Sequence, residues 1–289
     1  MRRMTALALV LLAAAAGCRA RGERPVRVGS KNFTEQVVLG ELAALALERA
    51  GVAVDRRLDL GGTFVCHHAI AAGELDLYPE YTGTAYTAIL GHPPASDPAA
   101  VLAAVEREYP PRFHAVWAPP LGFDNTFALV MRRAHASELS IASISDLAQR
   151  GTRLRPGFGY EFLERADGFP GLAKAYGLRF EQRPAEMDLG LLYAAIGQRR
   201  VDVVAGNATD GLIAAMDLVV LRDDRRYFPP YEAAFVVREA VWAKSKVRGA
   251  LERLSGKISP EAMRAMNAAV DKDRRRPADV AREFLDRLK

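Results

Sequence analysis

The residues that could support catalysis or bind a metal lie together at Cys66, His67 and His68. Adjacent histidines on a helix point in different directions, whereas two helical ligands for one metal need a spacing of three or four residues. The chain also has no Gly-x-Ser-x-Gly, His-Glu-x-x-His or phosphate-loop motif. We therefore expect no metal site, no cofactor and no enzymatic activity.

The other cysteine, Cys18, closes what looks like an export signal. Basic residues 1–3 precede an apolar run over 5–16, and Ala15, Ala16 and Gly17 lie just before the cysteine. The run is too short to span a membrane. This order predicts a lipoprotein signal peptide at 1–17, an acylated Cys18, a linker at 18–25 and an extracytoplasmic protein that is tethered to a membrane. An ordinary signal peptide that is cut elsewhere is the alternative.

The composition indicates a large globular protein without affinity for nucleic acid. Removing Arg2 and Arg3 with the signal lowers the formal charge from +5 to +3, and charges of both signs are interspersed. Half of the residues are apolar, so a chain of this length can bury a large core and favours two lobes. With Cys18 acylated, only Cys66 remains and no intrachain disulfide can form. We expect a monomer.

The hydrophobic spacing predicts alternating strands and helices joined by short links. In the first part this order is typical of a parallel α/β sheet with helices on both faces. Strands are expected at 26–29, 52–60, 75–78, 126–131, 201–204, 218–221 and 235–237. Helices are expected at 35–50, 63–72, 160–166, 171–176, 190–198, 247–257, 260–270 and 277–288, with one more that opens at Ser145-Asp146-Leu147 with a capping residue.

The chain order suggests two lobes with two crossings between them. Residues 26–124 and 226–289 would form lobe 1, and residues 125–225 would be inserted as lobe 2. Two crossings make a hinge, and a hinge makes a cleft that can close on a ligand. Residues 93–98 are expected to form a surface loop.

Several blocks of sequence resemble the glycine betaine/choline-type substrate-binding proteins of ABC osmoprotectant importers. They occur in the family's order from the first strand to near residue 270. The blocks are 30–36 (SKNFTEQ), 60–63 (LGGT), 74–84 (ELDLYPEYTGT), 121–129 (LGFDNTFAL), 165–172 (RADGFPGL), 209–211 (TDG), 223–224 (DD) and 228–231 (FPPY).

The resemblance implies the two-lobed periplasmic-binding-protein fold of type II, with the ligand in the cleft between the lobes. It implies a quaternary-ammonium ligand, with glycine betaine, choline and carnitine as candidates, and delivery to an ABC permease with its ATPase. Two alternatives stay open. The chain could bind a different small zwitterion, or it could be a sensor or scaffold that has lost tight betaine binding.

A quaternary ammonium group has no N–H, so aromatic faces hold it better than hydrogen bonds do. The resemblance implies that Tyr81, Phe127 and Tyr231 form the aromatic cage, with Phe127 where the family usually has tyrosine. A fourth ring expected just before the 209–211 block has no match, because residues 205–208 read Ala-Gly-Asn-Ala. The cage therefore looks incomplete.

The carboxylate end of a zwitterion needs positive charge and polar donors. By the same matching, Lys31, Thr84 and Arg165 would be the donors, and Asn125 and Glu161 would line the cleft beside them. Two cations would favour a zwitterion over choline, although both could instead be surface charges. Asn207 could contact the ligand or be a plain turn residue. Among the other tyrosines, Tyr78, Tyr86, Tyr160 and Tyr193 are expected to pack in the core, with Tyr160 as a possible replacement ring.

Overall fold

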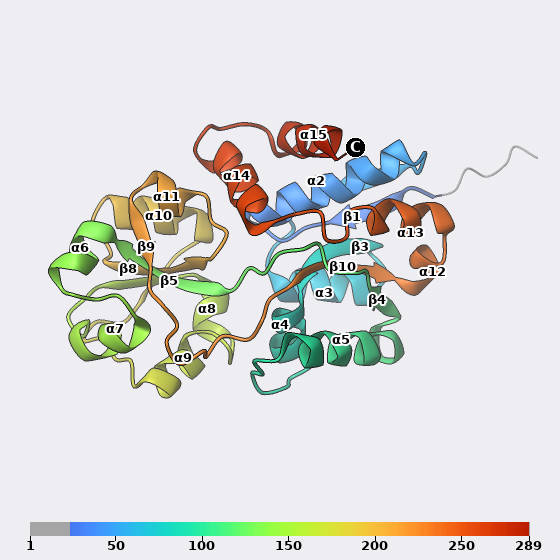
Figure 1. Ribbon diagram of the computed structural model, residues 1–289. Helices are drawn as coiled ribbons and strands as arrows, with labels where there is room; N and C mark the ends of the chain where they lie inside the picture. Colours follow the sequence, from blue (N-terminus) through green and yellow to red (C-terminus); the bar gives the residue numbers. More distant parts are fainter. Residues whose placement is uncertain (1–23, 289) are drawn as a thin grey trace, which may run out of the picture.

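A computed structural model describes residues 24–288 and contains two five-stranded sheets, each with its own helices (Figure 1). The predicted signal peptide and Cys18 lie outside the described residues. The first sheet has the order β2-β1-β3-β10-β4, with β2 Val54–Arg57, β1 Val26–Gly29, β3 Leu77–Tyr81, β10 Ala233–Arg238 and β4 Ala115–Trp117. The second has the order β7-β6-β8-β5-β9, with β7 Ala185–Glu186, β6 Pro156–Phe158, β8 Val203–Asn207, β5 Phe127–Arg132 and β9 Leu218–Val220.

The helices follow the strands in the expected alternation. No helix in the range 24–288 has the length and apolar character needed to cross a membrane. In chain order they are α2 Thr34–Arg49, α3 Thr63–Ala71, α4 Thr82–Thr84, the π-helix η1 Ala85–Ile89, α5 Pro98–Phe113, α6 Arg133–Glu138, α7 Ile144–Arg150, α8 Tyr160–Glu164, α9 Phe169–Tyr176, α10 Leu189–Gly197, α11 Leu212–Ala215, α12 Glu239–Trp242, α13 Ser245–Glu252, α14 Pro260–Asp271 and α15 Pro277–Arg287.

The sheets are mixed, which corrects the expectation of a parallel first sheet. Strand β1 is parallel to β2 and β3, but β10 is antiparallel to both β3 and β4. The reason lies in the chain path: β10 follows the return from the second sheet and enters the first sheet from the opposite direction. An antiparallel neighbour needs no crossover helix.

Two local sequence interpretations also need correction. Helix α7 has its capping residue at Ser143, whose hydroxyl accepts a hydrogen bond from the backbone N–H of Asp146, and not at Ser145. Helix α5 was not predicted. It starts directly after Asp97, whose carboxylate caps it, and Pro98 occupies the first helical position.

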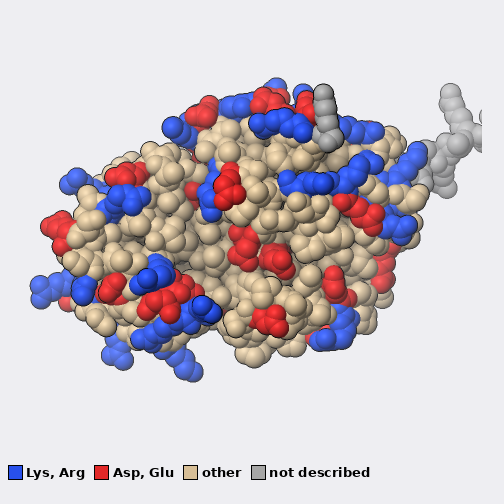
Figure 2. Space-filling model, in the orientation of Figure 1, with Lys and Arg blue, Asp and Glu red and all other residues tan. Residues whose placement is uncertain are grey.

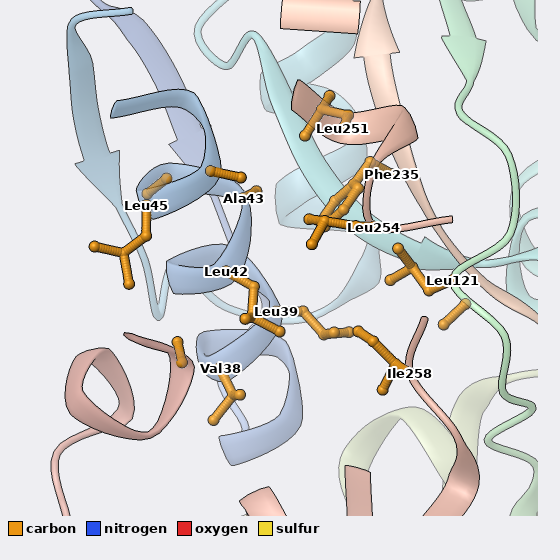
Figure 3. Packing of buried hydrophobic residues seen from close by; sticks show 14 of the residues in the cluster. Val38, Leu39, Leu42, Ala43, Leu45, Leu121, Phe235, Leu251, Leu254 and Ile258 are labelled. Carbon is orange, nitrogen blue, oxygen red and sulfur yellow. The ribbon is translucent and has the colours of Figure 1, made fainter. Parts of the chain in front are cut away.

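The core of the first lobe is built around α2. Leu39 and Leu42 on this helix are fully buried, as are Phe235 on β10 and Ile258 before α14 (Figure 3). The helices α13, α14 and α15 pack against α2, so its whole central part is buried. This packing fixes the N-terminal end of α2, where residues 31–35 approach the second lobe.

Two extended segments connect the lobes and lie side by side. The backbone N–H of Asn125 donates to the carbonyl of Tyr231 at 3.1 Å, and that of Ala233 donates to the carbonyl of Phe123 at 3.1 Å. The strands of each sheet fall on either side of these segments, and the boundaries at 124/125 and 225/226 stay a prediction. On the face shown in Figure 2, basic and acidic side chains are intermixed.

Candidate functional site

A pocket of about 50 Å³ lies between the two sheets and is lined from both lobes. It brings together every residue that the sequence analysis placed in the ligand site. They are Lys31, Tyr81, Thr84, Asn125, Phe127, Glu161, Arg165, Asn207 and Tyr231.

Aromatic rings form much of the pocket wall. The ring of Phe127 at the start of β5 lies 5.7 Å from that of Tyr231 and 5.0 Å from that of Phe162, measured between centroids. On the other side Tyr81, the last residue of β3, stacks on Phe33 at 6.5 Å. Edge-to-face and stacked arrangements of this kind are the favourable geometries for aromatic pairs.

Phe33 and Phe162 line the pocket but were missed by the sequence analysis. Phe33 stands inside the 30–36 block, two residues after the lysine that was selected. Phe162 follows Glu161 directly. The signal that could have found them is an aromatic residue within two positions of a polar site residue, at the start of a helix. With these two rings the pocket wall contains five aromatic side chains.

Lys31 is buried beside an acidic partner. Its ammonium group lies 2.5 Å from Glu80 Oε1 and donates to Thr63 Oγ1 at 2.9 Å. The same nitrogen lies 5.2 Å from the centre of the Tyr81 ring. Burial raises the pKa of Glu80, and the charge of Lys31 opposes that shift. Glu80 was not among the residues selected from the sequence motifs.

Arg165 is also buried and paired. Its guanidinium donates to both oxygens of Asp167, at 2.9 and 2.5 Å, and to Thr84 Oγ1 at 3.3 Å. Burial lowers the pKa of this guanidinium, but the Asp167 charge overrides it and the net shift is upward. Asp167 also accepts from the Tyr231 hydroxyl at 2.6 Å. The Arg165 carbon Cζ lies 5.0 Å from the Phe127 ring centre.

These ion pairs correct the expectation that Lys31 and Arg165 provide unpaired positive charge for a ligand carboxylate. Lys31 and Arg165 are 3% and 6% exposed, so neither is a surface charge, yet each already faces a carboxylate. With Glu161 in addition, three carboxylates stand against two cations around the pocket. The surroundings are therefore suited to a cation more than to an anion.

Glu161 on α8 connects the second lobe to helix α3 of the first. Its carboxylate accepts hydrogen bonds from the backbone N–H and, at 3.0 Å, from the hydroxyl of Thr63 at the start of that helix. It also lies 3.5 Å from Arg165 Nη1. Burial would raise its pKa, but the charges of Lys31 and Arg165 and the Thr63 hydrogen bonds hold the pKa of Glu161 below its usual value.

Glu35, at the start of α2, collects donors from four other segments. One oxygen accepts from the hydroxyl of Tyr81 and the amide of Asn125, both at 2.6 Å. The other accepts from Thr209 at 2.5 Å and from Asn267 at 3.0 Å. Burial raises the pKa of Glu35, and these hydrogen bonds oppose that shift. Asn125 therefore serves a buried network beside the pocket.

Asn207 ends β8 opposite Phe127 in the neighbouring strand. Its backbone N–H donates to Asp210 Oδ2 at 2.8 Å, so the residue also shapes a turn. Here the expected fourth ring is absent, and Ala205 and Gly206 line the pocket with Asn207.

The four tyrosines that were expected to pack in the core do not all do so. Tyr78 and Tyr193 are buried in core clusters, as expected. Tyr86 is half-buried and packs on His92. Tyr160, however, is 63% exposed and does not line the pocket, so it is neither a packing residue nor a replacement ring. It extends outward because it is the first residue of a short helix at the cleft edge.

Cys66, His67 and His68 do not share one environment, since the first two lie in the core and the third lies on the surface. Cys66 and His67 are buried, and burial raises the pKa of the Cys66 thiol to about 12 and lowers that of His67 to about 4. His68 is exposed. Within residues 24–288 no group of three histidine, cysteine or acidic side chains is placed to hold a metal ion.

Comparison with known proteins gives a consistent result. Residues 24–287 match the model of the substrate binding domain of ABC-type glycine betaine transport systems. The chain is 35% identical over 268 residues to the ergothioneine transport permease/ergothioneine binding protein EgtU of Helicobacter pylori, covering 92% of this chain and 48% of that protein. It thus spans about half the length of that relative. It is 34% identical over 266 residues to the carnitine transport binding protein OpuCC of Listeria monocytogenes, covering 91% and 86%.

A solved structure supports the architecture. The crystal structure of a glycine betaine/carnitine/choline ABC transporter protein superposes with a TM-score of 0.75 at 30% identity, covering 91% of this chain and 98% of that one. The two-lobed periplasmic-binding-protein fold that the sequence analysis predicted is thereby confirmed.

Proposed function

Because the chain belongs to the family of substrate-binding domains of ABC-type glycine betaine transport systems, we propose that its interlobe pocket captures a small trimethylammonium zwitterion. Proteins of this family bind substrates for transport and are not enzymes, and they act outside the cytoplasm. The bound zwitterion would be handed to an ABC permease that is driven by its ATPase.

The observation that carries this proposal is the aromatic lining of the pocket. Five rings, among them Tyr81, Phe127 and Tyr231, surround a small space that is encircled by more carboxylates than cations. Ring faces attract a cation and bury its methyl groups, whereas an anion would gain nothing there. The named ligands of the two relatives above, ergothioneine and carnitine, both carry a trimethylammonium group and a carboxylate.

We assign the carboxylate end of the ligand to Arg165, Lys31 and Thr84. Both cations are neutralised by their partners, so they would act mainly as hydrogen-bond donors. Two of the guanidinium nitrogens of Arg165, Nε and Nη2, already donate to Asp167 and Thr84. The third, Nη1, lies 3.5 Å from Glu161, which is longer than an ordinary hydrogen bond. Nη1 is therefore the nitrogen best suited to donate to the ligand carboxylate. Charge-assisted donors of this kind bind carboxylates strongly.

We further propose that the mature protein is an extracytoplasmic lipoprotein and acts as a monomer. The basic residues, the short apolar run and the small residues before Cys18 support acylation of that cysteine. A chain of this composition, with mixed charges over the face in Figure 2, suits a soluble receptor that is tethered near its permease.

The proposal is tested by calorimetric titration of residues 24–289 with glycine, dimethylglycine and glycine betaine. The three ligands differ only in the methylation of the ammonium group. Affinity is expected to rise from glycine to dimethylglycine to glycine betaine, because the aromatic rings bury the added methyl groups. In the variant Phe127→Leu, loss of the ring should cost about 1–2 kcal/mol, roughly tenfold in affinity for glycine betaine.

Phe113→Leu is the matched control, since this ring packs on His67 and Tyr109 outside the pocket. It should leave the affinity within twofold. Equal binding of glycine and glycine betaine, or an unchanged affinity in Phe127→Leu, would contradict the cage.

A further inference from the structure

Glu35 lies directly behind the wall of the pocket and does not line the pocket itself. Two lining residues nevertheless direct their donors at one of its oxygens. The Tyr81 hydroxyl and the side-chain amide of Asn125 both lie 2.6 Å from Glu35 Oε1. The residue borders another cavity but is only 2% exposed. A charge on this carboxyl therefore faces the pocket through Tyr81 and Asn125 and is poorly screened by water.

The hydrogen bonds around Glu35 favour its ionised form. Thr209 Oγ1 and Asn267 Nδ2 donate to Oε2 at 2.5 and 3.0 Å, so each oxygen accepts two hydrogen bonds. All four acceptor positions of a carboxylate are then used. Both amides are oriented by further contacts, because Asn125 Oδ1 accepts from the Thr209 backbone at 3.3 Å and Asn267 Nδ2 also donates to the Thr209 carbonyl at 3.0 Å.

The position of Glu35 on α2 favours the same form. Glu35 is the second residue of this 16-residue helix, and the N-terminal end of a helix carries partial positive charge that stabilises an anion. Burial raises the pKa of Glu35, and the helix end and the four donors act against that shift.

The charge of Glu35 is not balanced by a cation. Among residues 24–288 no lysine, arginine or histidine forms an ion pair with it. Lys31 lies 5.2 Å from the Tyr81 ring centre, but it is neutralised by Glu80 at 2.5 Å. Asp210 is also near, and it is a second negative charge. A cationic ligand in the pocket would supply the missing positive charge.

The Tyr81 hydroxyl connects this charge to the ligand side of the wall. A phenol that donates to a carboxylate becomes more electron-rich, and hydrogen bonds in a low dielectric polarise their partners. The face of the Tyr81 ring then attracts a cation more strongly. Direct Coulomb attraction between Glu35 and the cation adds to this effect. Both effects depend on the charge of the ligand and not on its shape.

We propose that Glu35 makes this pocket select a positively charged head group over an uncharged one of the same shape. Glu35 acts through Tyr81 and does not touch the ligand, so it is a positioning residue that determines specificity. This inference rests on the proposed function and deepens it. The rings alone would also bury uncharged methyl groups, whereas the buried carboxylate makes the positive charge itself a requirement.

The test compares two ligands of nearly identical shape. Glycine betaine and 3,3-dimethylbutanoate share the carboxylate and the three methyl groups, and they differ in the central atom, which is a positively charged nitrogen or a neutral carbon. Calorimetric titration of residues 24–289 at pH 8 should show at least about 30-fold tighter binding of glycine betaine. In Glu35→Gln, which keeps the shape and removes the charge, this preference should fall about tenfold.

Glu41→Gln is the matched control, because this carboxylate lies on the same helix, pairs with Arg56 and does not line the pocket. Its preference should stay within about twofold of wild type. Tyr81→Phe gives a second determination if Glu35→Gln does not fold, as judged by its thermal transition. Tyr81→Phe keeps the ring and loses the hydrogen bond to Glu35, so the preference should fall at least about threefold.

The ratio of the two affinities separates the proposed role from a structural one. A loosened pocket wall would weaken both ligands equally, so weaker binding with the wild-type preference in Glu35→Gln overturns the inference and leaves the proposed function intact. An unchanged preference in Tyr81→Phe, or equal binding of the two ligands by wild type, also overturns it. Failure of the wild type to bind glycine betaine overturns the proposed function itself.

Discussion

Lys31 and Arg165 show how the partner of a buried cation decides what that cation can do. Sequence motifs placed both in the cleft, and both line the pocket. Each, however, is held by a carboxylate, Glu80 or Asp167, that the motifs did not single out. Removing one member of such a pair would leave an unpaired buried charge, which costs about 3–5 kcal/mol. Alanine variants at these positions would therefore report on folding as much as on binding.

The partly buried carboxyl of Asp210 predicts a pH dependence of stability. Burial raises its pKa to about 6, its hydrogen bonds with Tyr193 and Asn207 oppose this shift, and the nearby Asp271 adds to it. Between the ordinary value of about 3.8 and about 6, the folded protein keeps a proton that the unfolded chain has lost. Stability of the ligand-free protein should therefore fall as the pH rises through this window.

Urea unfolding of wild type and Asp210→Asn between pH 4 and pH 7 checks this expectation. The variant should lose part of the downward slope, because burial also raises the pKa values of other carboxyls, which keep the remainder: Glu35, Glu80, Asp124 and Asp271. Identical slopes in both proteins would show that Asp210 titrates normally.

At the scale of elements, short helices position the site more than long ones do. Helix α8 has only five residues, yet it carries Glu161 and Phe162, and Arg165 follows it as the C-terminal capping residue. It is too short to be stable alone, so its orientation depends on packing of Phe162 in the second core cluster. Helix α7 lies in the same cluster and has its own local stabilisation.

The cap of α7 gives a prediction at this scale. Ser143 and Asp146 form a reciprocal capping box, so Ser143→Ala should lower stability by about 1 kcal/mol. Ser145→Ala should cost less, because the backbone N–H of Ser145 donates to the exposed Asp224 carboxyl and alanine keeps that N–H. Urea unfolding of the two variants checks the order. A larger loss at Ser145 would place the cap where the sequence analysis had expected it.

At the scale of the whole molecule, polar contacts hold the two lobes together around the pocket. Glu161 and Asp167 of the second lobe bind Thr63 and Thr87 of the first. Arg165 adds a bond to Thr84. These groups come from opposite sides of the cleft, so they can meet only when the lobes are close.

Loss of one such contact should shift the molecule toward an open form. In Glu161→Ala the contact with Thr63 is lost, which should weaken closure by about 1–3 kcal/mol. Small-angle X-ray scattering of the ligand-free variant should give a larger radius of gyration than wild type. Glu164→Ala, an exposed position on the same helix, is the control and should scatter as wild type does. Identical profiles for all three proteins would show that Glu161 does not contribute to closure.

The sequence by itself determined the alternation of strands and helices, because apolar spacing reflects which face of an element is buried. It also identified Tyr78 as a core residue and Tyr81 as the end of a strand, because a buried apolar stretch gives way to a Thr-Gly-Thr segment after Tyr81. Motif agreement selected nine side chains, and all nine line one pocket. Their contact with a ligand stays a prediction.

Only the tertiary structure decided what surrounds those side chains. Glu80 and Glu35 meet Lys31 and Thr209 across long stretches of chain, and no spacing rule connects such residues. The antiparallel direction of β10 depends on the path back from the second lobe. The backbone at Gly206 has no room for a side chain because Tyr193 and Asp210 converge there from another helix and a turn. Charge neutralisation and cavity shape arise from packing in three dimensions, which a one-dimensional pattern does not encode.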